Sequence, residues 1–98
     1  MTENYIQYVA GYQKDNINKK DISRAIKDIK QMDDEHGAFW VSVITDDENV
    51  IEVSKNLKLS FMSAGSAMKY QAKSWDEVQE LYELLLDERF TDIRAKIA

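Results

Sequence analysis

The most constraining feature of this chain is a block of alternating apolar and polar residues over 38–72, with a helical pattern on each side of it. Alternation with a period of two is typical of strands that bury one face. Short polar segments at 45–49, at Asn56 and at 63–66 divide the block, and the chain contains no proline that would interrupt a strand. Because connections this short favour antiparallel neighbours, we predict an antiparallel meander.

The segment 38–44 shows how the two faces of such a sheet would differ. The face expected to point into the core contains Phe39, Val41 and Val43. The opposite face contains Trp40, Ser42 and Ile44. Two interpretations of the tryptophan remain open: either helices cover its face as well, or Trp40 is partly exposed and can anchor an interface.

Capping signals mark the start of a helix on either side of the block. Asp21 follows Asn18 by three residues, and Glu77 follows Ser74 by three residues, which is the spacing of a capping box. Behind each cap, apolar residues recur at the spacing of one buried helical stripe. These residues are Ile22, Ala25, Ile26, Ile29 and Met32 in the first helix and Trp75, Val78, Leu81, Tyr82 and Leu85 in the second.

The ends of the chain add shorter elements to this plan. Residues 5–10 predict a first strand, and residues 90–98 predict a short closing helix capped by Thr91. With 98 residues, of which 44% are hydrophobic, the chain can form one core. We therefore predict a single domain over residues 1–98 of the α+β class, an antiparallel meander of about four to five strands with two to three helices packed mainly on one face. The expected core consists of Ile26, Ile29, Phe39, Val41, Val43, Leu59, Phe61, Val78, Leu81 and Leu85.

The composition excludes several kinds of catalytic and metal site. The chain has no cysteine, so a thiolate metal site, a disulfide and a cysteine nucleophile are impossible. Its one histidine, His36, follows the acidic run 33–35, whose carboxylates favour the charged imidazole. Neither a nucleophile nor an oxyanion site can be identified to accompany it. We therefore expect no catalytic residue, no metal site and no cofactor, and hence a protein that is not an enzyme.

Charge and hydropathy limit the compartment and the partners. The chain has 18 Asp and Glu against 13 Lys and Arg, a net charge of −5, which opposes binding to nucleic acid. No apolar run approaches the roughly 18 residues of a membrane span, and the first residues do not resemble a signal segment. We expect a cytoplasmic protein with no membrane partner, and its acidity suits a basic protein partner.

The most uneven charge distribution lies in the second helix. Residues 75–88 contain six acids and no base, whereas residues 19–30 contain five bases and two acids. Helical spacing aligns four of the acids along one exposed line, which we call the acidic stripe: Asp76, Glu80, Glu83 and Asp87. The stripe is either a solvated face or a docking surface that steers a basic partner onto the protein.

Further candidates for a partner-binding surface lie outside this helix. Trp40 and Tyr70 are the large aromatic side chains that we expect to anchor an interface. The acidic segment Asp46, Asp47 and Glu48 lacks the spacing of a calcium loop, so it is predicted to be a solvated hairpin turn. The sheet, that turn and the run 33–36 are the places to seek a binding surface if the acidic stripe is only solvated.

The order of these pieces resembles a known class of proteins. Gly37-Ala-Phe-Trp-Val-Ser-Val-Ile, an acidic turn, Val50-Ile-Glu-Val, a meander, and Ser74-Trp-Asp-Glu-Val-Gln-Glu-Leu with Phe90-Thr-Asp-Ile together span residues 37–97. This layout is similar to small immunity proteins of bacterial polymorphic-toxin and contact-dependent inhibition systems. The resemblance implies a cytoplasmic, non-enzymatic protein that binds its cognate toxin and blocks the active site or the substrate entrance.

Three functional hypotheses follow from the sequence. The first is an immunity protein that occludes the active site of a cognate toxin, one that is basic and directed at nucleic acid. The second is a small regulatory or adaptor domain that self-associates through the face of Trp40. The third is an enzyme with a carboxylate site, for which no residue pattern stands out.

Overall fold

The structure, a computed structural model, describes residues 3–9, 11–32 and 37–97. Within these residues the chain forms six strands in one antiparallel sheet and three helices. The strands are β1 (Glu3–Tyr8), β2 (Gln13–Asp15), β3 (Ala38–Ile44), β4 (Glu48–Ser54), β5 (Lys58–Ser63) and β6 (Ser66–Gln71). The helices are α1 (Lys19–Lys30), α2 (Trp75–Leu86) and α3 (Phe90–Ile97).

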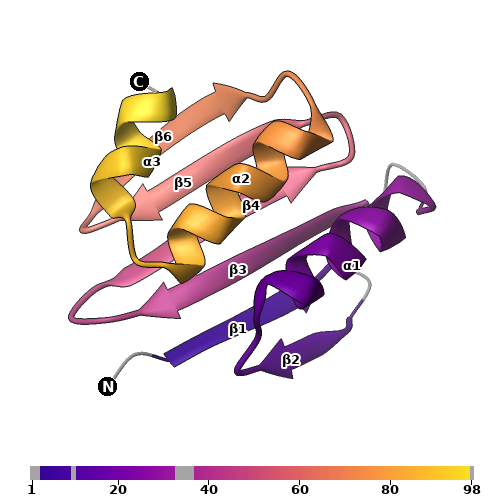
Figure 1. Ribbon diagram of the computed structural model, residues 1–98, viewed down its shortest axis with the longest axis horizontal. Coiled ribbons are helices and arrows are strands. Elements are labelled where there is room, and N and C mark those ends of the chain that lie inside the picture. Colours follow the sequence, from indigo (N-terminus) through magenta and orange to yellow (C-terminus); the bar gives the residue numbers. More distant parts are fainter. Residues whose placement is uncertain (1–2, 10, 33–36, 98) are drawn as a thin grey trace.

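The strand order across the sheet is β2-β1-β3-β4-β5-β6 (Figure 1). The predicted meander is therefore present from β3 to β6, and β1 pairs antiparallel with β3. All three helices lie on the same face of the sheet, with α2 across its centre, as Figure 1 shows. The predicted α+β class and the packing of helices on one face are confirmed.

The strand count exceeds the prediction by one because β2 carries no apolar signal. All three of its residues are polar and exposed, and it joins the sheet through backbone pairing with β1. The connection between the two strands includes Gly11 at a φ of 110°, a conformation that glycine adopts without steric cost. A short hairpin strand of this kind is held by its turn and by its neighbour, so periodicity cannot reveal it.

Both predicted helix starts are confirmed. At α1 the Asn18 side chain accepts a hydrogen bond from the backbone N–H of Lys20, and the Asp21 carboxylate accepts one from the N–H of Asn18. At α2 the Ser74 hydroxyl accepts from the N–H of Glu77. The prediction that Thr91 caps the last helix is wrong, because α3 already begins at Phe90.

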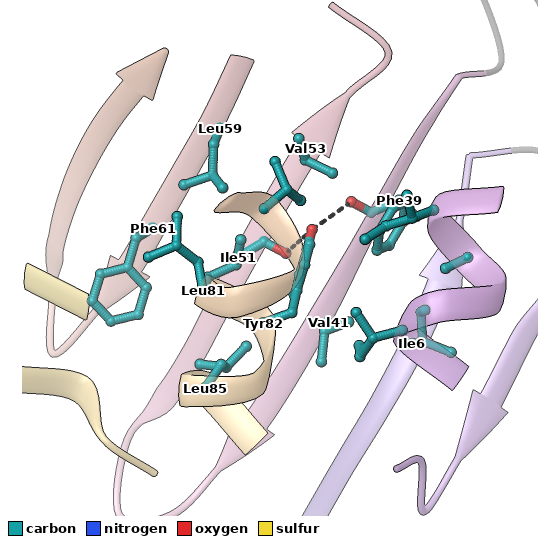
Figure 2. Packing of buried hydrophobic residues seen from close by; sticks show 14 of the residues in the cluster. Ile6, Phe39, Val41, Ile51, Val53, Leu59, Phe61, Leu81, Tyr82 and Leu85 are labelled. Atoms are coloured by element: carbon teal, nitrogen blue, oxygen red, sulfur yellow. Dashed lines mark hydrogen bonds between the residues drawn. The ribbon is translucent and has the colours of Figure 1, made fainter. Parts of the chain in front are cut away.

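The core lies between the helices and the sheet face that they cover, and every residue predicted for it is buried. At its centre the ring of Tyr82 stacks on that of Phe39, with 5.0 Å between the ring centroids (Figure 2). The Tyr82 hydroxyl lies 3.2 Å from the carbonyl oxygen of Ile51 and 3.4 Å from that of Phe39. Burial raises the pKa of Tyr82 well above its ordinary value, so the hydroxyl keeps the proton that it donates to these carbonyls.

None of the helices in the described part of the chain combines the length and the apolar character needed to cross a membrane.

Candidate protein-binding surface

The second face of the sheet is not covered by any helix that the structure describes (Figure 1). Strand alternation places on it the side chains that do not contribute to the core. Pairing aligns Tyr5, Ser42, Val50 and Met62 in one row across four neighbouring strands. Trp40 stands in the adjacent row, opposite Glu52. We call the four apolar and aromatic side chains Tyr5, Trp40, Val50 and Met62 the open-face patch.

The open-face patch is accessible to a partner. Met62 is 42% exposed, while Tyr5 and Trp40 are half-buried. Together with Ser42, Glu48 and Glu52, the patch lines a shallow hollow of about 220 Å³. Of the two interpretations of Trp40, the structure therefore supports partial exposure on an uncovered sheet face.

Two exposed carboxylates border the patch. Glu48 and Glu52, which we call the rim carboxylates, stand on either side of Val50 on the outward face of β4. Within the residues that the structure describes, neither of them lies within 4.0 Å of a cationic group. The cations Lys58 of β5 and Lys69 of β6 point to the same face, where they line a second hollow together with Glu52. The half of the face over β3 and β4 is thus aromatic at its centre and negative at its rim.

Ser42 is a residue of this face to which the sequence assigned no role. Its side chain is 0% exposed, and its hydroxyl oxygen has no hydrogen-bond partner among the described residues. A buried hydroxyl in a folded protein is normally hydrogen-bonded, because leaving one unpaired costs about 1–3 kcal/mol. The signal in the sequence was a small polar residue inside an otherwise apolar strand, and burial at the hollow distinguishes it from an ordinary strand serine.

The predicted acidic turn lies beside the patch. Asp46 and Asp47 are exposed in the connection from β3 to β4, and Glu48 begins β4. No group of three or more Asp, Glu and His side chains that could hold a metal ion occurs in the described residues. The turn can therefore add negative charge to the rim of the open-face patch.

A buried polar network fixes this turn, and the sequence did not predict it. The Asn49 side-chain amide donates hydrogen bonds to the carbonyl oxygens of Val43 and Asp47, at 3.0 and 3.1 Å. The hydroxyl of Ser63 donates to the amide oxygen of Asn49 at 2.5 Å. Arg94 of α3 donates in turn to the Ser63 hydroxyl at 3.0 Å. The chain of contacts ties α3 and β5 to the turn that carries the acids.

The acidic stripe lies on the helix side of the molecule, away from the open-face patch. Its negative charge is partly neutralised by bases from other helices. A count of acids and bases along residues 75–88 alone does not include these bases. Glu80 pairs with Lys96 of α3 at 2.6 Å, and Asp87 pairs with Lys19 of α1 at 3.3 Å. Asp76 is exposed, and Glu83 accepts a hydrogen bond from Gln79. The stripe and the open-face patch are therefore separate surfaces.

Tyr70 does not join Trp40 in one surface. It lies opposite Leu59, on the helix side of the sheet, and its hydroxyl donates to the Glu77 carboxylate at 2.9 Å. This contact ties β6 to the first turn of α2. The remaining candidates, the acidic run 33–35 and His36, lie outside the described residues.

The arrangement on the open face provides the parts of a protein-binding surface. Half-buried aromatic rings supply contact area, and a rim of carboxylates favours positively charged partners. Comparisons of the chain with protein-family models, with curated proteins and with solved structures give no match.

Proposed function

We propose that this chain is an immunity protein, which binds a basic, nucleic-acid-directed toxin in the cytoplasm and occludes its active site. The observation that carries the proposal is the open-face patch, a sheet face that no described helix covers. It has half-buried aromatic rings, and the carboxylates around them form no ion pair with any described residue. A toxin that acts on nucleic acid needs a positive active-site surface. Carboxylates on a rigid sheet can occupy such a surface in place of phosphates.

The charge of the chain supports the same proposal. A net charge of −5 opposes direct binding to nucleic acid and speeds the approach of a basic protein. The carboxylates of the rim are free of ion pairs within the described residues, whereas two members of the acidic stripe are already paired. The open face is therefore the more strongly supported docking surface, and the stripe is a secondary one that affects association rate.

Co-expression with a candidate toxin tests the proposal. In the source organism the gene directly upstream is expected to encode a protein that arrests growth, and co-expression of this chain is expected to restore growth. Trp40→Ala and the double variant Glu48→Lys with Glu52→Lys should lose protection. Asp92→Lys, a charge reversal on α3 outside the acidic stripe, should keep it. Unchanged protection by both open-face variants, at matched expression, would contradict the proposed site.

The second candidate function is self-association through the open-face patch. The exposed Met62 and the half-buried Trp40, which line the same hollow, favour it, because apolar side chains of this size on an open sheet face can pack against a second copy. Sedimentation velocity over a hundredfold range of protein concentration separates the two functions. A sedimentation coefficient that rises with concentration and becomes constant in Trp40→Ala would favour the regulatory or adaptor domain.

A further inference from the structure

The hollow in the open-face patch combines three features that are complementary to a single kind of side chain. Its sides are aromatic, since Tyr5 and Trp40 line it. Its rim holds two carboxylates without a cationic partner in the described part of the chain. It is also lined by the buried Ser42 hydroxyl, whose hydrogen-bonding capacity is unused within the described residues.

The rim carboxylates are spaced so that both can act on one group above Val50. They are four residues apart on one strand, which is roughly 13 Å between Cα atoms, with Val50 midway and on the same face. Each glutamate side chain can lean several ångströms toward the middle. A cation over Val50 is therefore attracted from both ends, and one that lies toward Glu52 also approaches the ring of Trp40, its cross-strand neighbour.

A guanidinium group fits these features better than an ammonium group. It is planar, so it can stack on an aromatic ring while its edge donates to a carboxylate. Its five N–H donors point in several directions, so one can reach a carboxylate and another a hydroxyl oxygen. An ammonium is compact and strongly hydrated, and it loses more hydration when it enters a partly apolar hollow.

We propose that the hollow lined by Tyr5, Trp40 and Ser42 and bordered by Glu48 and Glu52 receives an arginine side chain of the protein partner. The guanidinium stacks on Trp40 and pairs with a rim carboxylate. As it enters, it displaces the side chains that cover Ser42 and donates a hydrogen bond to the buried hydroxyl. This inference rests on the proposed function for the existence of a partner, and it names the chemical group by which that partner is anchored.

The test uses a short peptide probe, acetyl-Gly-Arg-Gly-amide, and the indole N–H signals of the ¹⁵N-labelled protein. The chain has two tryptophans, Trp40 in the patch and Trp75 on the helix side, so the second is an internal control. We expect the Trp40 signal to shift saturably with a Kd in the millimolar range, as suits a single side chain, while the Trp75 signal stays in place. The matched lysine peptide should bind at least threefold more weakly, and the citrulline peptide, which lacks the charge, should not bind.

Three variants locate the binding. Glu52→Gln should weaken arginine-peptide binding at least fivefold, and the matched control Asp92→Asn on α3, outside both the open-face patch and the acidic stripe, should leave it unchanged. Ser42→Ala should also weaken it, although the substitution removes an unpaired buried hydroxyl and should leave the urea midpoint equal or higher. Together these results would separate a role in binding from a role in folding.

Equal shifts of the two tryptophan signals, equal binding of the arginine and lysine or citrulline peptides, or full binding by Glu52→Gln would each overturn the inference. These outcomes differ from failure of the proposed function. If the peptide does not bind but Trp40→Ala abolishes protection against the toxin, the open face is the docking surface and its anchor is another group.

Discussion

Replacing Asn49 with alanine should remove the support of the acidic turn and destabilise the whole protein. Asn49 is 2% exposed, and its side chain donates to the carbonyl oxygens of Val43 and Asp47 and accepts from the Ser63 hydroxyl. Each hydrogen bond contributes roughly 1 kcal/mol, and buried groups left without partners add to the loss. We therefore expect Asn49→Ala to lower the free energy of unfolding by about 3 kcal/mol.

Urea unfolding followed by circular dichroism measures this loss. With an m value of about 1.5 kcal/mol/M, the midpoint should fall by about 2 M. The control is Asp46→Ala in the same turn, which removes an exposed side chain and should change the free energy by less than about 0.5 kcal/mol. A double-mutant cycle with Ser63→Ala should show a coupling energy of about 1 kcal/mol. A loss below about 1 kcal/mol for Asn49→Ala would refute the reasoning that this network supports the turn.

Three further predictions concern the core, the helix cap and the acidic stripe. Ile29→Ala should lower the free energy of unfolding by about 2–5 kcal/mol in urea titrations, because this side chain of α1 is buried in the core. A loss under about 0.5 kcal/mol would mean that α1 does not pack on the sheet through this face. The pKa of Glu77 is lowered, chiefly by the hydrogen bond that its carboxylate accepts from the N–H of Lys73. The stability that this carboxylate contributes is therefore complete above its ordinary pKa of 4.5 and is lost as the pH falls through the lower pKa of the folded state. Glu77→Gln should flatten the fall of the urea midpoint over that pH range, and an unchanged profile would contradict this role of Glu77. In stopped-flow measurements at low salt, the double variant Glu80→Lys with Glu83→Lys should associate with the partner more slowly than the parent. The decrease should be smaller than for charge reversal of the rim carboxylates, because a lysine of α3 already pairs with Glu80. A larger decrease for the stripe variant than for the rim variant would make the stripe the main docking surface.

Local signals in the sequence were sufficient to predict most of the fold. The starts of α1 and α2 depend on side-chain caps within three residues, at Asn18 and Ser74, so the relevant contacts are all local. The core face of each long strand follows from alternation, because one side must be apolar to pack under the helices. β2 was missed because its exposed polar residues join the sheet by backbone pairing alone, and Thr91 was misassigned because α3 begins one residue earlier, at Phe90.

The candidate site was less predictable because its properties come from contacts between distant segments. Alternation placed Trp40 and Ser42 on one face, but the coverage of that face depends on how the helices cross the sheet. The acidic stripe has no base on its own helix, yet Lys96 and Lys19 reach it from α3 and α1. Asn49 was assigned to the polar turn 45–49, and the strand register and its burial show that it points into the protein.

The decisive measurement is the affinity of the proposed toxin for the Trp40→Ala variant. This substitution removes an aromatic side chain of the open-face patch and leaves the helix side intact. Removal of an interface anchor costs about 2 kcal/mol or more, which corresponds to at least a 30-fold increase in Kd. We expect this increase by titration calorimetry against the purified toxin, and we expect the variant to keep the far-ultraviolet spectrum and the cooperative urea transition of the parent. A Kd within threefold of the parent value would contradict the claim that the protein binds its partner through the open face of the sheet.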